Sequence, residues 1–198
     1  MTNTAKKAVS FLFEVGTMRK IARGHRQSLL TDDLSDNISS HSYRVTWIGW
    51  LLAKMENVDP YKVLLMCLSH DTSEARSGDQ NWIHKKYVKV FEDEIIKDQI
   101  EGLPAENELK LVTSEYNKRE TKESRIAKDA DLLDQLLLLK EYVLAGNNEA
   151  VSWLKNDGNN KNKHIELLYS KSAKKIAKEI MKQNPSDWWK NVWTEKRR

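Results

Sequence analysis

Four residues, His41, His70, Asp71 and Asp131, have side chains that can bind a metal, although a single histidine or aspartate on a helix is more often a surface or core hydrogen-bonding group. His70 and Asp71 directly follow the apolar run of residues 63–68, and Asp131 stands inside a second apolar stretch. Imidazole and carboxylate groups in such surroundings are costly unless they are paired or bound to a metal. Mixed nitrogen and oxygen donors suit a divalent ion such as Zn, Mn, Co or Fe and leave positions for water and substrate, which is a hydrolytic arrangement.

Each of these side chains falls in or beside a segment with a helical pattern of apolar residues. The first segment covers about residues 37–56 and carries His41 in its opening turns. The second starts at residues 59–60 with an aspartate and a proline, which suit the cap and the first position of a helix, and ends near residues 70–74. The third covers residues 122–145 and contains Asp131. Three separate helices are therefore expected to supply the four side chains.

The rest of the chain is also expected to be helical. Apolar periodicity predicts helices at residues 5–22, 87–101, 105–117, 149–156 and 163–183, whereas residues 24–36 and 79–86 show no regular pattern. Three tryptophans follow near the end of the chain at nearly helical spacing, Trp188, Trp189 and Trp193. No strand pattern or internal repeat is present, and the 198 residues contain only 3 prolines and 7 glycines. The sequence predicts one all-α domain over residues 1–198.

Composition excludes several other classes of protein. The longest apolar runs, residues 63–68 and 136–139, are far shorter than the ~20 residues that a membrane-spanning helix needs. No cleavable signal is evident near the N-terminus, so a cytoplasmic protein is expected. The single cysteine, Cys67, cannot form an internal disulfide and fits a small core residue better than a nucleophile. The net charge of +4 is concentrated in the last third, which is more typical of a solvated helix face than of a nucleic-acid site.

The order of His41, then His70 and Asp71, then Asp131 resembles the HD-domain phosphohydrolase superfamily. Residues 70–79, HDTSEARSGD, and residues 127–131, AKDAD, look like the branch that contains bacterial 5′-deoxynucleotidases and the eukaryotic HD-domain-containing protein 2. Residues 140–149 are similar to the bacterial enzyme. The resemblance covers about residues 23–149 and leaves a C-terminal helical extension, residues 150–198, unexplained. It implies a single HD-domain helical bundle.

The resemblance also implies roles for individual residues. His41, His70, Asp71 and Asp131 would bind a divalent metal ion, with Co, Mn, Zn, Fe and Mg all left open. Glu74 lies four residues after His70, so on a continuing helix its carboxylate would stand beside the metal and activate the attacking water.

The implied substrate contacts are less closely matched. Asp79 would contact the sugar, and an arginine before the first histidine would contact phosphate; Arg26 is the best match in register and Arg23 is a close rival. This chain lacks the tryptophan that commonly follows the arginine, which leaves the choice between deoxyribose and ribose open. Trp82 would stack on a base or sugar and His84 would reach phosphate, although a tryptophan at that spacing is at least as typical of packing.

The function that the resemblance implies is hydrolysis of (deoxy)ribonucleoside 5′-monophosphates to nucleoside and phosphate by a metal-dependent 5′-nucleotidase. A dNTP triphosphohydrolase or pyrophosphohydrolase is an alternative, because Lys85, Lys86 and Lys89 could accept further phosphates. A nucleotide-sensing module without turnover is disfavoured, since Glu74 and all four ligands are present. Nucleic-acid binding by the tryptophan-rich end is less economical than docking of these tryptophans on the bundle or on a second subunit. Related small HD proteins are commonly dimers, so a homodimer is expected.

Overall fold

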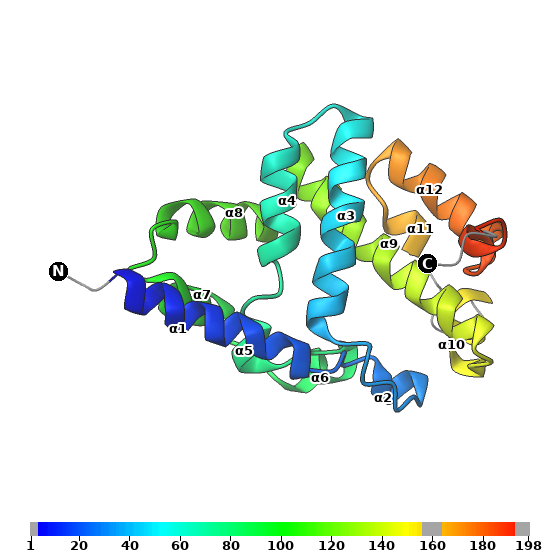
Figure 1. Ribbon diagram of the computed structural model, residues 1–198, viewed down its shortest axis with the longest axis horizontal. Helices are drawn as coiled ribbons and strands as arrows, with labels where there is room; N and C mark the ends of the chain where they lie inside the picture. The colour runs from blue at the N-terminus through cyan, green and yellow to red at the C-terminus, as the bar shows by residue number, and fades with distance from the viewer. Residues whose placement is uncertain (1–3, 156–163, 193–198) are drawn as a thin grey trace, which may run out of the picture.

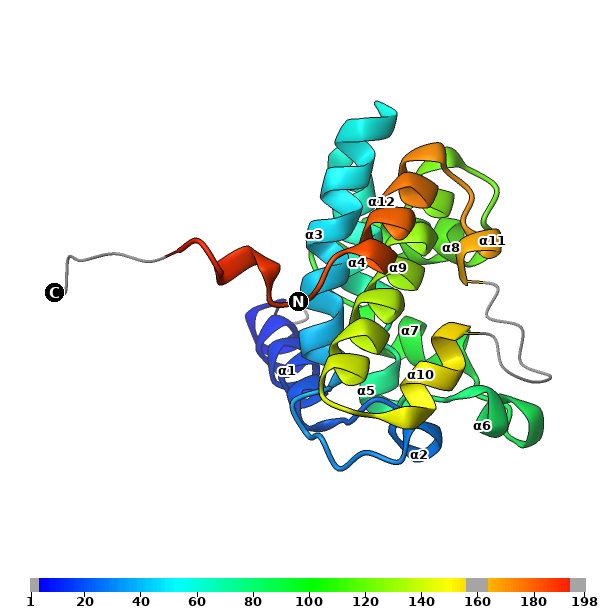
Figure 2. The ribbon, with the colours of Figure 1, turned by 90° about the vertical axis from the view of Figure 1, so that its right-hand side faces the viewer.

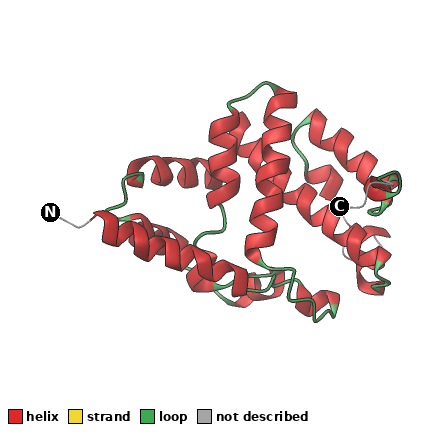
Figure 3. Ribbon diagram, in the orientation of Figure 1, coloured by secondary structure: helices red, strands yellow, loops and turns green. Residues whose placement is uncertain are grey.

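The computed structural model describes residues 4–155 and 164–192, and these residues form an all-helical fold, as predicted (Figure 3). Their one β-type contact is an isolated bridge between Ala22 and Asn37. No helix in the described ranges is long and apolar enough to cross a membrane.

Three helices build the centre of the molecule: α3 (Ile38–Glu56), α4 (Pro60–Ser69) and α9 (Lys122–Leu144). In Figure 1, α3 and α4 run side by side and α9 crosses them. Gly49 on α3 faces Cys67 on α4 so closely that a Cβ at position 49 would collide with the cysteine sulfur. Cys67 is a buried free thiol, as the sequence predicted. The main core includes side chains from all three helices, among them Val45, Leu52, Met66, Cys67, Ala130 and Leu133.

The starts of the central helices follow from local sequence signals. The Asn37 side chain accepts a hydrogen bond from the Ser40 amide and so caps α3. Asp59 caps α4 in the same way, with proline at the first helical position. Thr121 caps α9. These caps satisfy amide groups that have no partner inside the helix, which fixes where each helix begins.

The other helices of the described residues surround this centre. They are α1 (Thr4–Gly16), η1 (Thr17–Lys20), α2 (Arg26–Leu29), α5 (Glu74–Ser77), α6 (Trp82–Tyr87), α7 (Glu92–Ile100), α8 (Glu106–Lys118), α10 (Asn148–Lys155), α11 (His164–Leu167), α12 (Lys171–Lys182) and η2 (Asp187–Trp189). The extension after residue 149 contributes to the main core, because Leu168, Ala173 and Ala177 are buried there.

Several helix boundaries differ from those that the sequence predicted, and the short helix α2 lies within residues 24–36, where no regular pattern was seen. The first helix does not continue to residue 22 but gives way to a 3₁₀ turn after Gly16. Residues 79–86 are not irregular throughout, since the Asn81 side chain accepts hydrogen bonds from the amides of Ile83 and His84 and starts α6. The helix predicted at residues 87–101 starts only at Glu92, after an extended segment.

The helix predicted at residues 163–183 is also interrupted, and its break has a tertiary cause. Asp129 on α9 is fully buried, and its carboxylate accepts hydrogen bonds from the backbone amides of Tyr169 (2.7 Å) and Ser170 (2.8 Å). Those amides are held by the side chain of another helix, so the chain leaves α11 and starts again as α12 with Ser170 as its cap. The local apolar periodicity carries no information about this contact.

Where the structure describes it, the tryptophan-rich end leaves its rings largely exposed, although Trp188 lines a groove with residues of α3, α9 and α12. The side chains of Trp188 and Trp189 are 78% and 54% exposed. Figure 2 shows the η2 segment, up to residue 192, projecting away from the helices. Trp193, the third tryptophan of the predicted set, lies outside the described residues.

Candidate metal centre

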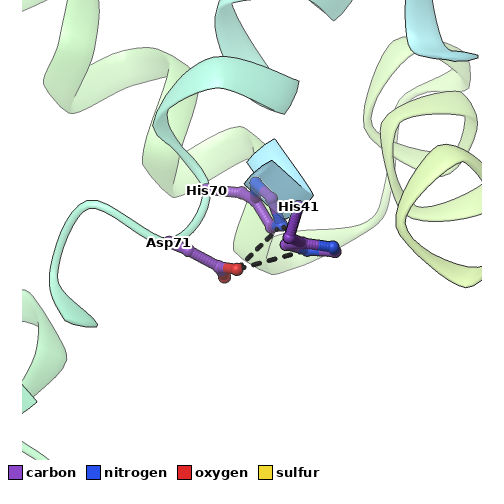
Figure 4. Close-up of side chains that lie close together, drawn as sticks. All are labelled: His41, His70 and Asp71. Atoms are coloured by element: carbon purple, nitrogen blue, oxygen red, sulfur yellow. Dashed lines mark hydrogen bonds and ion pairs between the residues drawn. The ribbon is translucent and has the colours of Figure 1, made fainter. Parts of the chain in front are cut away.

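The ends of two central helices bring His41, His70 and Asp71 together (Figure 4). The Nε2 atoms of the two histidines lie 3.2 Å apart, and Asp71 Oδ2 lies 3.2 Å from His70 Nε2 and 3.4 Å from His41 Nε2. One donor atom of each residue lies within 4.8 Å of the others. Asp131 reaches this group from α9, with its Oδ1 3.4 Å from His41 Nε2. The structure thus brings together all four residues that the sequence singled out as ligands.

Both histidine rings are turned so that Nε2 faces the centre. His70 donates from Nδ1 to the carbonyl oxygen of Cys67, one turn earlier in the chain, at 2.9 Å. The Nδ1 atom of His41 lies 2.6 Å from Oδ2 of Asp134 on α9. A hydrogen bond at one ring nitrogen fixes the tautomer and leaves the other nitrogen free to bind a metal. This arrangement suits two neutral imidazole ligands.

Asp134 contacts a candidate ligand, although the sequence pattern did not single it out. It is buried, and its second oxygen accepts a hydrogen bond from Arg44 Nε, while Arg44 also contacts Glu141. The available signal was its place three residues after Asp131 within an apolar stretch of α9, since residues at that spacing share a helix face. A buried carboxylate in that position needs a partner, and here the partners are His41 and Arg44.

The carboxylates around His41 favour positive charge on its ring. Burial and the nearby Arg23 guanidinium both lower the pKa of His41. Hydrogen bonds to Asp131, Asp134 and Asp71 outweigh them, so the pKa of the ring lies well above its ordinary value. The pocket therefore stabilises a cation between carboxylates, and a metal ion binding there would compete with the His41 proton.

The two candidate carboxylate ligands stay ionised. Burial raises the pKa of Asp71, but His70 and His41 outweigh it and hold that pKa well below its usual range. Burial likewise raises the pKa of Asp131. Lys128 and His41 outweigh this effect and hold that pKa well below its ordinary value. The Lys128 ammonium lies 2.6 Å from Asp131 Oδ2. Both groups are therefore anionic at neutral pH, which is the state that binds a metal.

Glu74 lines a cavity with Asp71 and Asp131, but its pKa is raised where theirs are lowered. It is the first residue of α5, and its Oε2 atom is buried without a hydrogen-bond partner. Burial, followed by the charges of Asp71 and Asp79, raises the pKa of Glu74 to about 10. This carboxyl group can carry a proton at neutral pH beside two carboxylates that cannot, as an acid or base in catalysis must.

Arg23, and not Arg26, reaches this centre. Its Nε lies 2.9 Å from Asp79 Oδ2 and its Nη1 lies 3.5 Å from Asp71 Oδ2. Asp79 also accepts a 2.8 Å hydrogen bond from the Gly24 amide. A Cβ at position 24 would come within 2.6 Å of the Asp79 carbonyl oxygen, so glycine permits this close approach of the two loops. Two residues from the predicted substrate set, Arg23 and Asp79, are thus placed beside the ligands.

The other predicted substrate contacts lie elsewhere. Arg26 belongs to α2, and Trp82 and His84 belong to α6; none of the three lines the cavity that holds His70 and Asp71. The Trp82 ring packs against Trp153 of α10, with ring centroids 4.7 Å apart. In this structure Trp82 therefore packs against another helix, which was the alternative to stacking on a base or sugar.

The cavity has a volume of about 440 Å³, which is the size of site that small-molecule ligands occupy. Its walls combine acidic and basic side chains. The acids are Asp71, Glu74, Asp79, Glu92 and Asp131, and the bases are Arg23, Lys85, Lys89, Arg119 and Lys128. Such a mixture can hold a cation and, next to it, an anionic group of a substrate.

The chain is similar to several known proteins. A family model described as HD domain matches residues 17–183. A 5′-deoxynucleotidase of Vibrio cholerae serotype O1 is 30% identical over 142 residues, which cover 63% of this chain and 71% of the relative. A conserved hypothetical protein from Pyrococcus furiosus superposes with a TM-score of 0.70 at 25% identity, over 88% of this chain and 99% of the other. A predicted metal-dependent phosphohydrolase from Magnetospirillum magnetotacticum shares the fold with a TM-score of 0.64 at 22% identity, over 90% and 91% of the two chains.

Proposed function

Because the chain belongs to the HD-domain family, we propose that it is a metal-dependent 5′-nucleotidase, which hydrolyses (deoxy)ribonucleoside 5′-monophosphates to nucleoside and phosphate. The observation that carries the proposal is the convergence of His41, His70 and Asp71 at a cavity that is lined by His70, Asp71 and the protonatable Glu74. The relatives named 5′-deoxynucleotidase support this substrate class. A cytoplasmic location would suit such a substrate.

The four candidate ligands, His41, His70, Asp71 and Asp131, would hold one divalent ion. Two imidazole nitrogens with carboxylate oxygens fit Mn, Co, Fe or Zn, whereas Mg binds mainly to oxygen and fits this donor set less well. A bound ion would polarise the phosphate and lower the pKa of a water molecule in its coordination shell.

The remaining steps belong to side chains of this chain. Arg23, held by Asp79, orients the phosphate beside the ligands. A cation bound at Asp71 would offset the negative charge that raises the pKa of Glu74, so that Glu74 could ionise, accept a proton from the attacking water and deliver it to the 5′ oxygen of the leaving nucleoside. Asp79 keeps free lone pairs beyond its contacts with Arg23 and Gly24, so it can also accept a hydrogen bond from a sugar hydroxyl.

The first experiment is a substrate screen of the purified protein with Mn, Co, Zn, Mg or chelator. Ribo- and deoxyribonucleoside mono- and triphosphates are incubated separately and the products are identified by chromatography. Metal-dependent release of nucleoside and orthophosphate from monophosphates is the expected result. Complete inactivity with metal bound would overturn the enzymatic proposal in favour of a nucleotide sensor.

Glu74→Gln tests the proton-transfer step. The variant should lose 10²–10⁴-fold in kcat, the usual contribution of a general acid or base, while its metal content stays unchanged. Glu92→Gln is the matched control, because Glu92 lines the same cavity but no role in proton transfer is assigned to it. Full activity of Glu74→Gln would remove Glu74 from the mechanism.

A triphosphohydrolase is the second candidate, and one observation favours it. Lys85 and Lys89 line the metal cavity, whereas Lys86 does not. These two ammonium groups could bind phosphates beyond the one at the metal. In the same screen, turnover of triphosphates with no turnover of monophosphates would select this candidate.

We further propose a homodimer that uses an apolar groove between α1, α3 and α4. The groove has a volume of about 930 Å³, and the outer face of α3 presents Tyr43, Trp47 and Trp50 to it. Tyr43 and Trp47 are 68% and 53% exposed, and the three residues repeat at the spacing of one helix face. Exposed apolar patches with several aromatic residues are typical of interfaces.

The chain itself supplies an occupant for this groove. Trp188 and Trp189 are exposed, and a two-fold axis would place these tryptophans of each copy on the groove of the other. Light scattering coupled to size exclusion should give a dimer mass for the full chain and a monomer mass for Trp47→Glu. Tyr87→Glu, which changes an exposed aromatic residue outside the groove, should remain dimeric. A monomeric full chain would exclude the proposal.

A further inference from the structure

Arg119 lies in the wall of the metal cavity and is held there by an aromatic ring. Its guanidinium carbon stands 3.4 Å from the centroid of the Tyr116 ring. The Tyr116 ring in turn meets His70 edge to face, with centroids 5.5 Å apart. Arg119, Tyr116 and His70 all line the same cavity. The guanidinium is therefore one aromatic ring away from a candidate metal ligand.

Apart from its contact with the Tyr116 ring, the positive charge of Arg119 is not paired with a carboxylate in the described part of the chain. Arg23 is paired with Asp79, and Lys128 is paired with Asp131. Arg119 has no acidic partner within residues 4–155 and 164–192, and its Nη1 atom is buried without a hydrogen bond. An unsatisfied buried donor is costly and rare in folded proteins, and an anion from outside the chain would satisfy it.

The backbone holds this arginine in a conformation that is unusual for its type. Arg119 follows the last residue of α8 with φ 58° and ψ 26°, the left-handed region in which glycine or asparagine is preferred. Its carbonyl oxygen accepts a 3.0 Å hydrogen bond from Arg125 Nε. Strained positions of this kind concentrate at functional sites, where the strain places a side chain. Here it places the guanidinium over Tyr116.

We infer that Arg119 binds the phosphate group of the substrate and is a specificity residue for phosphate monoesters. The inference rests on the proposed nucleotidase function and extends it. Arg23 is balanced by Asp71 and Asp79, so it contributes little net charge to a phosphate dianion. Arg119 brings an unbalanced charge and a planar set of donors that suits two phosphate oxygens. Stacking on Tyr116 keeps the side chain in place before the substrate arrives, which reduces the entropy lost on binding.

The test uses inorganic phosphate as the probe, so that binding is read without turnover. Phosphate is titrated calorimetrically into the metal-loaded wild-type protein, Arg119→Gly, Arg119→Lys and Lys118→Ala. Glycine suits the left-handed backbone at position 119, so Arg119→Gly should keep its fold. Lys118 is the matched control, because it is the adjacent cation and does not line the cavity.

Arg119→Gly should weaken phosphate binding by about tenfold to a hundredfold, the usual effect of removing a charge-assisted hydrogen bond. Arg119→Lys should recover part of this loss, because it restores the charge without the planar donors, and Lys118→Ala should bind as the wild type does. KM for a monophosphate substrate should rise in parallel, with a smaller change in kcat. Equal phosphate affinity of Arg119→Gly and the wild type would overturn the inference.

The inference and the proposed function can fail separately. A wild-type protein that hydrolyses monophosphates, with an Arg119→Gly variant of unchanged KM and phosphate affinity, would refute the role of Arg119 alone. A wild-type protein that binds phosphate through Arg119 but hydrolyses no monophosphate would refute the nucleotidase proposal alone.

Discussion

His41 Nδ1 and Asp134 Oδ2 lie 2.6 Å apart, although 93 positions separate the two residues in the chain. The contact joins α3 to α9 and determines which ring nitrogen of His41 faces the candidate metal centre. Because Asp134 is buried and also contacts Arg44, its carboxylate has little freedom to move away.

We therefore predict that Asp134→Asn lowers metal affinity by 10–100-fold, the usual effect of removing a group that orients a histidine ligand. Titration of Mn or Co into the metal-free protein, followed by calorimetry, measures the change. Glu141→Gln is the control, since Glu141 contacts the exposed side of Arg44 and does not reach His41. Unchanged affinity in Asp134→Asn would show that the ring is oriented by other contacts.

Features of this fold that depend on residues close together in the sequence could be predicted from the sequence. The starts of α3, α4 and α9 depend on capping groups within three residues of each helix, so the sequence predicts them. The exit of His70 and Asp71 from an apolar helix is equally local. The all-helical class is also confirmed, because helical periodicity of apolar residues is a local signal.

Features that depend on contacts between distant segments were not predictable from local patterns. Arg23 rather than Arg26 reaches the centre because Gly24 allows its loop to approach Asp79, 55 residues away. Asp134 gains its role only when α9 packs against α3, and the break between α11 and α12 exists because Asp129 binds two distant amides. A single sequence carries no direct record of such pairings.

Asp129 should be a structural residue although it lies two positions before a candidate ligand. Replacing it with asparagine puts an amide group where two backbone N–H groups need acceptors, so Asp129→Asn should lose about 1–3 kcal/mol of unfolding free energy. Urea denaturation measures this loss. Metal affinity should stay close to the wild-type value, since the Asp131 contacts are not touched. A stable Asp129→Asn protein with weakened metal binding would show that Asp129 acts at the metal centre and is not a structural residue.

Glu14 gives the stability of the protein a defined dependence on pH. Its carboxylate accepts hydrogen bonds from Arg76 Nε (2.6 Å) and Nη2 (3.0 Å) and from Gln99 (2.8 Å). The Arg76 hydrogen bond is the main cause that lowers the pKa of Glu14 below 4.5. A lowered pKa in the folded state means stabilisation that is complete above about pH 4.5 and disappears as the pH falls through the folded pKa.

Glu14→Gln should therefore be less stable than the wild type at pH 7, and the difference should shrink below pH 4.5. Urea unfolding of both metal-free proteins between pH 3 and pH 7 tests the prediction. Glu101→Gln alters an exposed glutamate and should follow the wild type at every pH. A difference between Glu14→Gln and wild type that does not vary with pH would mean that the carboxylate charge is not involved.

Gly24→Ala should damage both stability and the phosphate site. The added Cβ would lie 2.6 Å from the Asp79 carbonyl oxygen and 3.0 Å from the Asn81 amide nitrogen, and backbone atoms cannot rotate aside as a side chain can. The loop must shift, which costs about 1–3 kcal/mol for an overpacked position and separates Arg23 from Asp79. The variant should therefore unfold at lower urea and show a raised KM for monophosphates.

Gly16→Ala is the matched control for this substitution. Gly16 has helical backbone angles, and the nearest atom to an added Cβ is the end of the flexible Arg19 side chain at 4.0 Å. Alanine there should leave KM unchanged and stabilise the protein by up to about 1 kcal/mol, because it restricts the unfolded chain. If Gly24→Ala matched Gly16→Ala in both stability and KM, the close approach of the two loops would have no part in placing Arg23.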